Sequence, residues 1–181
     1  MKCLSLLEPW ALLVALAGHH DPEVRRLAKK FETRSWPTKY RGTLAIHASK
    51  EKKYIDMRSD YYICGDEPFY SVLMDRAKKM SRIDPFKVNL PRGAVIATCR
   101  LVDCIEIVWS LEDVDRIAPS CLIGEHGKVY TISDNEAAFG DYNPGRYAFI
   151  LDDVKPLPEP VPAKGRLGLW EWTPPEGVKL P

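Results

Sequence analysis

The chain has 181 residues, of which 45% are hydrophobic and 28% are charged, and its formal net charge is +1. This size and balance predict one globular domain over residues 1–181 with a core of its own. No apolar run reaches the roughly 18 residues of a membrane helix, so the sequence excludes a membrane-spanning segment and gives no reason to expect a membrane partner. A net charge near zero does not identify a partner, since polyanion binding depends on how charge is distributed.

Hydrophobic periodicity and turn residues predict the elements in chain order. The predicted strands are apolar and β-branched runs between turn residues, at 1–7, 31–35, 43–49, 94–108 (one strand or a pair), 129–132 and 146–154. The predicted helices begin at proline or capping residues, at 9–17, in a short turn from Asp21, at 66–80 and in a short turn from Ser110. Many strands without a β-α-β alternation predict an α+β fold, namely a small mixed β-barrel flanked by helices.

The N-terminus is similar to a secretory signal in one respect, because an apolar run over residues 11–17 follows Lys2. Glu8 and Pro9 interrupt this pattern, and proline is typical of the first turn of a helix. The five cysteines are scattered and include no C-x-x-C pair, which favours reduced thiols over a zinc site or a redox dithiol. We therefore expect a cytoplasmic protein that holds no metal and no other cofactor.

Charge is distributed unevenly along the sequence. Residues 23–58 contain eleven basic and four acidic residues, a net charge of +7, whereas residues 103–153 contain three basic and eleven acidic residues, a net charge of −8. The first segment is therefore a candidate anion-binding surface, and the second is not.

The segment 29–37 (KKFETRSWP) concentrates the residue types of a nucleotide site. If it is extended, the two-residue period places Glu32, Arg34 and Trp36 on one face. The carboxylate can accept from a base or hold Lys29 in place, the guanidinium can bind phosphate, and the indole can stack on a base. The structural alternative is an exposed strand face that carries an Arg–Glu ion pair and a packed tryptophan.

More polar residues follow this segment. Lys39 and Arg41 are candidates for phosphate contacts, and the end of the next predicted strand adds His47, Ser49 and Lys50. His47 is also a candidate acid or base, with a hydrogen-bonded core histidine as the alternative.

A turn over residues 141–146 (DYNPGR) feeds the last long strand. Its Asn-Pro-Gly sequence favours a turn that presents Tyr142 and Arg146 at its edges. We expect this turn to form one rim of a cleft beside Glu32. The alternative is an ordinary turn with Tyr142 packed on the barrel.

Several segments together resemble the ASCH domain family. The spacing K-x-x-E-x-R of Lys29, Glu32 and Arg34 is similar to the family's motif. The other segments that carry the resemblance are 4–11 (LSLLEPWA), 45–50 (AIHASK), 90–97 (LPRGAVIA), 139–148 (FGDYNPGRYA) and 168–172 (GLWEW).

The resemblance implies a PUA-like β-barrel that binds RNA or modified nucleosides in a cleft beside the motif. Some members are described as amidohydrolases of acylated cytidine and others as ribonucleases. The chain departs from the family where Leu27 replaces the motif glycine and Glu8 the usual glutamine. The amidohydrolases carry a threonine at the position of Glu32. Thr33 is one step away and is expected on the opposite face, so a threonine nucleophile is not supported.

Two function classes follow, and the first is favoured. A binding module would take single-stranded RNA or DNA, or a nucleotide-like small molecule, through ligand contacts from Arg34, Trp36, Lys39, Arg41, Ser49, Lys50, Tyr142 and Arg146. A hydrolase of a nucleoside amide or a phosphodiester would use Lys29 and Glu32 as an acid–base pair, with His47 as a third member. A protein-interaction domain that docks a partner through Trp170 and Trp172 is a third class, and buried packing is the alternative use of those tryptophans.

Overall fold

A computed structural model describes residues 1–51, 91–110 and 118–181 of the chain. The helix predicted at 66–80 and most of the turn predicted from Ser110 lie outside the described residues.

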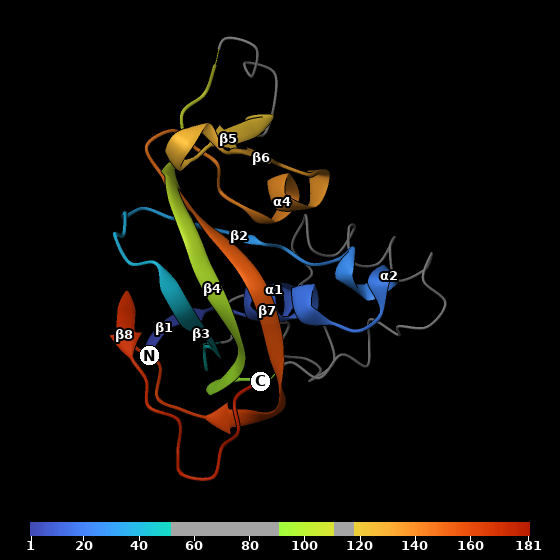
Figure 1. Cartoon of the computed structure of the whole chain (residues 1–181), viewed down its shortest axis with the longest axis vertical. Coiled ribbons are helices and arrows are strands. Elements are labelled where there is room, and N and C mark those ends of the chain that lie inside the picture. Colours follow the sequence, from blue (N-terminus) through green and yellow to red (C-terminus); the bar gives the residue numbers. More distant parts are fainter. Residues whose placement is uncertain (52–90, 111–117) are drawn as a thin grey trace.

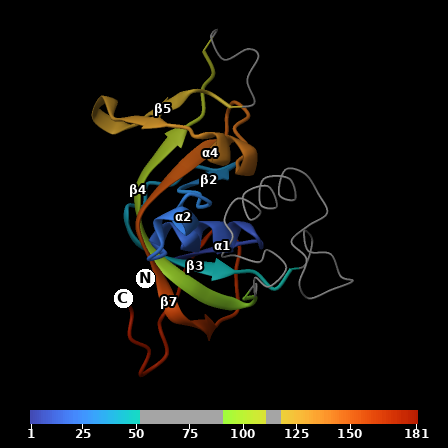
Figure 2. The ribbon, with the colours of Figure 1, turned by 90° about the vertical axis from the view of Figure 1, so that its right-hand side faces the viewer.

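Six strands form one strongly curled sheet, a half-barrel with the order β2-β7-β4-β3-β1-β8 (Figures 1 and 2). Their bounds are β1 Lys2–Leu6, β2 Phe31–Arg34, β3 Gly42–Ala48, β4 Ala94–Glu106, β7 Tyr147–Pro162 and β8 Leu169–Glu171. The sheet is mixed, because β1 and β3 are parallel while every other pair is antiparallel. Register shifts occur at three places between β4 and β7, and such bulges increase the bend of long strands.

A separate two-stranded hairpin consists of β5 (Cys121–Ile123) and β6 (Val129–Thr131). It lies at one end of the long strands, together with the short helix α4 (Asp134–Phe139) (Figure 1). The side chain of Ser133 caps this helix by accepting a hydrogen bond from the Glu136 backbone N–H. α4 lies at the end of the sheet where β2 begins.

Two short helices occupy the inner side of the curl (Figure 2). They are α1 (Trp10–Ala15), which continues as a 3-10 turn over Leu16–Gly18, and α2 (Pro22–Arg25). A Cβ atom on Gly18 would lie 2.2 Å from the Val154 carbonyl oxygen. Only glycine therefore lets the end of the first helix lie this close to β7.

Both faces of the curled sheet are buried. Leu4, Ile46 and Phe149 belong to the cluster that packs on α1. Cys3 points to the other face, as the two-residue period of a strand requires, and packs there with Trp170 and Trp172. The two tryptophans are only 8% and 6% exposed. They are core residues, and the docking role considered for them is not supported.

The predicted α+β fold, a small mixed β-barrel flanked by helices, is confirmed in the form of this half-barrel. The predicted strands correspond to β1, β2, β3, β4, β6 and β7, and β4 is one long strand. Among the described residues, four short elements were not predicted: β5, the 3-10 turn Glu125–Gly127, α4 and β8. Each covers only three to six residues, too few for a hydrophobic period to emerge.

Within the described residues, no helix is long and apolar enough to cross a membrane. Cys3, Cys99, Cys104 and Cys121 are free thiols.

Candidate functional site

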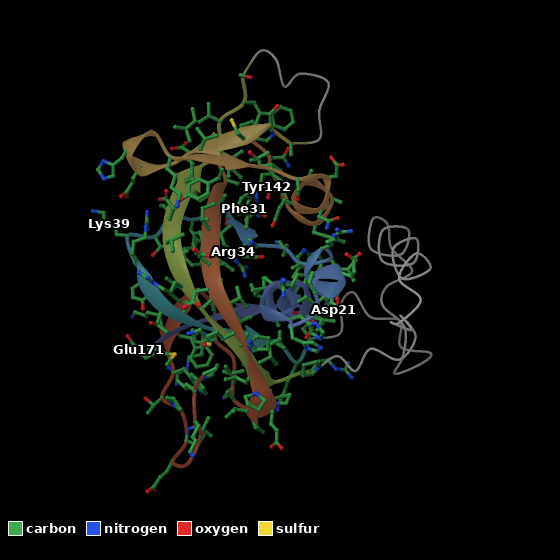
Figure 3. All side chains as sticks on the ribbon, turned by 45° about the vertical axis from the view of Figure 1, so that its right-hand side comes forward. Asp21, Phe31, Arg34, Lys39, Tyr142 and Glu171 are labelled. Atoms are coloured by element: carbon green, nitrogen blue, oxygen red, sulfur yellow. The ribbon has the colours of Figure 1, made fainter. Side chains whose placement is uncertain are left out.

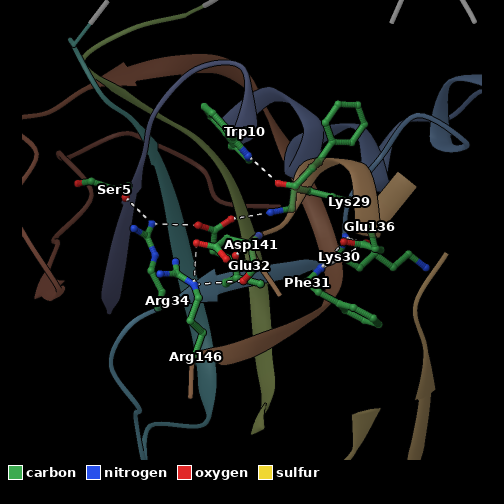
Figure 4. Close-up of polar contacts among 12 residues, drawn as sticks. Ser5, Trp10, Lys29, Lys30, Phe31, Glu32, Arg34, Glu136, Asp141 and Arg146 are labelled. Atoms are coloured by element: carbon green, nitrogen blue, oxygen red, sulfur yellow. Dashed lines mark hydrogen bonds and ion pairs between the residues drawn. The ribbon is translucent and has the colours of Figure 1, made fainter. Parts of the chain in front are cut away.

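Lys29 lies at the end of the turn that follows α2, immediately before β2. Its backbone N–H donates to the Leu13 carbonyl oxygen, which fixes it against α1. The side chain is 1% exposed, and its Nζ atom lies 2.8 Å from Oε2 of Glu32 (Figure 4). A buried amine with a carboxylate at this distance forms a charge-assisted hydrogen bond.

Glu32 joins two cations. Its second oxygen, Oε1, lies 3.2 Å from Nη2 of Arg34, which also donates to the Ser5 carbonyl oxygen at 3.0 Å. The prediction that Glu32 and Arg34 share a face of an extended segment is therefore confirmed. The Arg34 side chain is 26% exposed, and its Nε atom has no hydrogen-bond partner among the described residues.

A second buried carboxylate reaches the same place from α4. Glu136 accepts hydrogen bonds from the backbone N–H groups of Lys30 and Phe31, and so ties the start of β2 to the helix. Burial raises the pKa of the Glu136 carboxyl, while the positive charge of Lys29 and these backbone donors oppose the rise. Lys29 thus lies in the field of two carboxylates.

The opposite wall comes from the segment after α4. The Asp141 backbone N–H donates to the Thr33 hydroxyl at 3.0 Å, and Arg146 Nε lies 3.2 Å from Asp141 Oδ2 (Figure 4). Trp10 closes one side, with its indole Nε1 held 2.8 Å from the Phe139 carbonyl oxygen. These contacts fix both the turn and the indole ring in place.

Together these residues line an open cavity of about 350 Å³, which we name the motif cavity. Its wall holds three cations, two acids and one indole: Lys29, Arg34, Arg146, Glu32, Asp141 and Trp10. As expected from the sequence, the 141–146 turn forms a rim beside Glu32. Arg146 is on this rim. Its two terminal Nη atoms have no interaction with another described residue.

Tyr142, from the same turn, does not face the cavity. It is 2% exposed and packs in the core with Phe31, Ile105 and Ile150 (Figure 3). The buried ring offers no exposed face to a base, so the structure does not support the predicted ligand contact of Tyr142. The tyrosine is packed as in the alternative, while Asp141 and Arg146 of the same turn line the cavity.

Trp36 also lies away from the motif cavity. Its ring packs edge-on against Phe149, with the ring centroids 5.0 Å apart. The two-residue period extended only to Arg34, because β2 ends there and Pro37 follows. Trp10 is the aromatic residue of the site instead.

The remaining predicted residues are distributed over other parts of the molecule. Arg41 is engaged by Asp103 at 3.0 Å and by Glu125 at 3.4 Å. Lys39 is exposed and lies apart from Arg34 (Figure 3). Neither residue lines the motif cavity.

His47, Ser49 and Lys50 line a different cavity, of about 710 Å³. His47 is 1% exposed, and its Nε2 atom lies 3.1 Å from the Ala163 carbonyl oxygen. It does not join Lys29 and Glu32, so the structure does not support a catalytic group of these three. The alternative of a hydrogen-bonded core histidine is correct.

The expected separation of basic and acidic surfaces is not complete among the described residues. Arg41 of the basic segment pairs with Asp103 of the acidic one, and Lys30 donates its backbone N–H to Glu136. The antiparallel pairing of β2 with β7, and the packing of α4 on β2, bring the two segments together. Net charge per sequence segment therefore does not describe the faces of the molecule.

Three site residues were not predicted: Trp10, Glu136 and Asp141. Trp10 and Asp141 fall inside the segments that carry the family resemblance. Glu136 ends the pattern Ser133-Asp-Asn-Glu136, which is typical of a helix start and gives no sign that the carboxylate is buried. Among the described residues, no group of three or more histidine, cysteine or acidic side chains could hold a metal ion.

Comparison with known proteins yields no matching family model and no similar curated protein. The case for a function therefore depends on the geometry of the motif cavity and on the family resemblance of the segments that form it.

Proposed function

We propose that the chain is an ASCH-type, PUA-like domain that binds nucleic acid or a modified nucleoside in the motif cavity. One observation carries this proposal: Arg34 and Arg146 line the same small cavity as Trp10 and the Lys29–Glu32 ion pair. An indole can stack on a base, and guanidinium groups offer donors to phosphate and base oxygens.

The state of the two arginines supports binding of an acceptor-rich ligand. Glu32 uses one nitrogen of Arg34, and Asp141 uses Nε of Arg146. Nε of Arg34 is buried, but Nη1 of Arg34 and both Nη atoms of Arg146 have no partner among the described residues. The ion pairs orient the arginines while leaving donors for a ligand.

The contacts of Lys29 and Glu32 favour a binding site over a hydrolase. Both carboxylate oxygens of Glu32 are engaged by cations, and Lys29 Nζ donates to one of them. A general base needs an atom free to accept a proton, and a nucleophile needs an activating base. Thr33, which the two-residue period placed on the opposite face from Glu32, also lines the motif cavity, so that expectation is wrong. Its hydroxyl accepts a hydrogen bond from the Asp141 backbone N–H, and no described base is hydrogen-bonded to it.

Binding of a fluorescently labelled, ten-nucleotide single-stranded RNA, and of the DNA of the same sequence, tests the proposal by fluorescence anisotropy. Affinity should fall with salt, by about 0.7 in log K per log salt unit for each phosphate neutralised. Arg34→Ala should lower affinity about tenfold, the value of one charged hydrogen bond. Arg100→Ala is the matched control, because Arg100 is exposed and lines neither cavity.

Equal losses for Arg34→Ala and Arg100→Ala would remove the motif cavity from the proposal. Incubation with N4-acetylcytidine tests the hydrolase alternative, and we expect no turnover above background. Turnover that both Lys29→Ala and Glu32→Ala abolish would replace the binding proposal with an amidohydrolase. Cleavage of the RNA that the same two variants abolish would replace it with a ribonuclease.

A further inference from the structure

The second cavity, which we name the His47 cavity, differs from the motif cavity in its charge. Its described lining contains Lys50, Lys164 and Arg166 but no acidic residue. The three cations are exposed, and none is in an ion pair with another described residue. A concave wall with three positive charges that no described acid compensates attracts an anion.

Hydrogen bonds hold the backbone next to Lys164 in place. Ala163, which precedes Lys164, donates its N–H to the Gly93 carbonyl oxygen at 2.9 Å, and its own carbonyl oxygen lies 3.1 Å from His47 Nε2. Both backbone groups of Ala163 are therefore fixed to neighbouring strands. A phosphate would meet a wall that is already in place, which lowers the ordering cost of binding.

Lys50 is positioned by a glycine. Gly93 has a φ of +66°, and a Cβ atom there would lie 2.4 Å from Cε of Lys50. The aliphatic part of Lys50 thus runs over the backbone of Gly93, which brings its ammonium group to the cavity that both residues line.

His47 supports this wall without contacting the anion. A carbonyl oxygen only accepts, so Nε2 carries the proton that it donates to Ala163. Burial and, to a smaller extent, the nearby Lys50 lower the pKa of His47, while the hydrogen bond to Ala163 opposes this shift, so the balance favours the neutral ring. Its Nδ1 atom is buried, and a Cβ on Gly165 would lie 2.8 Å from it, so the Gly165 backbone covers this nitrogen.

Ser5 connects residues of the two cavities. Its carbonyl oxygen accepts from Arg34, which lines the motif cavity, while Ser5 itself lines the His47 cavity. One residue of β1 therefore contacts the arginine of a cavity suited to a base and lines a cavity suited to an anion. Ligands that present both a base and an anion are nucleotides and nucleic-acid strands, and a strand can place the two in separate cavities.

We infer that the His47 cavity binds a backbone phosphate of the strand whose base occupies the motif cavity, so that the ligand is an oligonucleotide rather than a free nucleoside. This inference rests on the proposed function. It adds Lys50, Lys164 and Arg166 as the phosphate contacts.

The test compares three ligands by isothermal titration calorimetry: cytidine, the dinucleotide CpC and the ten-nucleotide RNA. The variant is Lys164→Ala with Arg166→Ala. The matched control is Arg100→Ala with Lys179→Ala, which removes the same charge from exposed residues outside both cavities. We expect the variant to bind CpC and the RNA about tenfold or more weakly than the unmodified protein. Its affinity for cytidine should be unchanged, and its salt slope should fall by about 0.7 for each phosphate that the protein no longer neutralises.

Equal losses for the variant and the control overturn the inference, as does an equal loss for cytidine and CpC. The proposed function fails separately. If the unmodified protein binds none of the three ligands, both proposals are wrong. If it binds all three and Arg34→Ala weakens each, while the Lys164/Arg166 variant behaves as the control, only the inference is wrong.

Discussion

Replacing Glu32 by glutamine removes the negative charge that pairs with Lys29 and Arg34 in the motif cavity, while it keeps the size of the side chain. The variant leaves Lys29 charged, 1% exposed and without its 2.8 Å partner. Removal of one member of a buried ion pair costs about 3–5 kcal/mol, since the other charge stays buried. We expect a loss in this range for Glu32→Gln, because only Glu136 remains to compensate Lys29.

The opposite replacement, Lys29→Met, should cost clearly less. Glu32 then still has Arg34 at 3.2 Å, and no cation is left buried. The double variant should therefore be more stable than Glu32→Gln alone, because it removes the uncompensated charge. This order of stabilities, rather than any single value, identifies an ion pair that stabilises by mutual compensation.

Urea unfolding of the four proteins, followed by circular dichroism, gives the free energies of unfolding. A loss below about 1 kcal/mol for Glu32→Gln would mean that the pair behaves as an exposed one, against its burial. A larger loss for Lys29→Met than for Glu32→Gln would refute the assignment of Arg34 as the second partner of Glu32.

Burial raises the pKa of Glu8 from 4.5 to about 7, so the folded protein binds this proton more tightly than the unfolded chain and its stability falls as pH rises between these values. Above pH 7 this effect lowers the free energy of unfolding by about 3 kcal/mol, and Glu8→Gln should remove it. Urea unfolding at pH 5 and pH 8 should therefore give a smaller difference in the free energy of unfolding for Glu8→Gln than for the unmodified protein. Trp10→Leu should lower RNA affinity about tenfold, the value of one stacked base, whereas Trp36→Leu should lower only the melting temperature; equal affinities for the two variants would argue against stacking on Trp10. A Cβ on Gly140 would lie 2.3 Å from the Tyr142 ring, so Gly140→Ala should displace the cavity rim and weaken RNA binding, and unchanged affinity would show that the rim is not needed.

The longer strands and the pairing of Glu32 with Arg34 followed from local patterns. A strand of four or more residues carries its own period of two, and that period placed these two side chains on one face of β2. The same reasoning failed for Trp36, because the period holds only while the chain stays extended.

Contacts between distant segments of the chain decide which residues line each cavity. Lys29 and Asp141 are 112 positions apart, and Ser5 and Gly165 are 160 positions apart, yet each pair lines one cavity. No local pattern links residues so distant along the chain. Pairing between strands that are far apart in sequence brings them together, and the curl of the sheet decides which side chains face the same space.

From the sequence alone came the α+β class, the position of most strands and the motif at 29–34, because each depends on neighbours within a few residues. Only the tertiary structure showed that His47, Ser49 and Lys50 line a different cavity from Lys29 and Glu32. It also showed that Trp10, and neither Trp36 nor Tyr142, lines the motif cavity with Lys29 and Glu32. The physical reason is that burial and charge compensation depend on distance in space, which the order of residues along the chain does not determine.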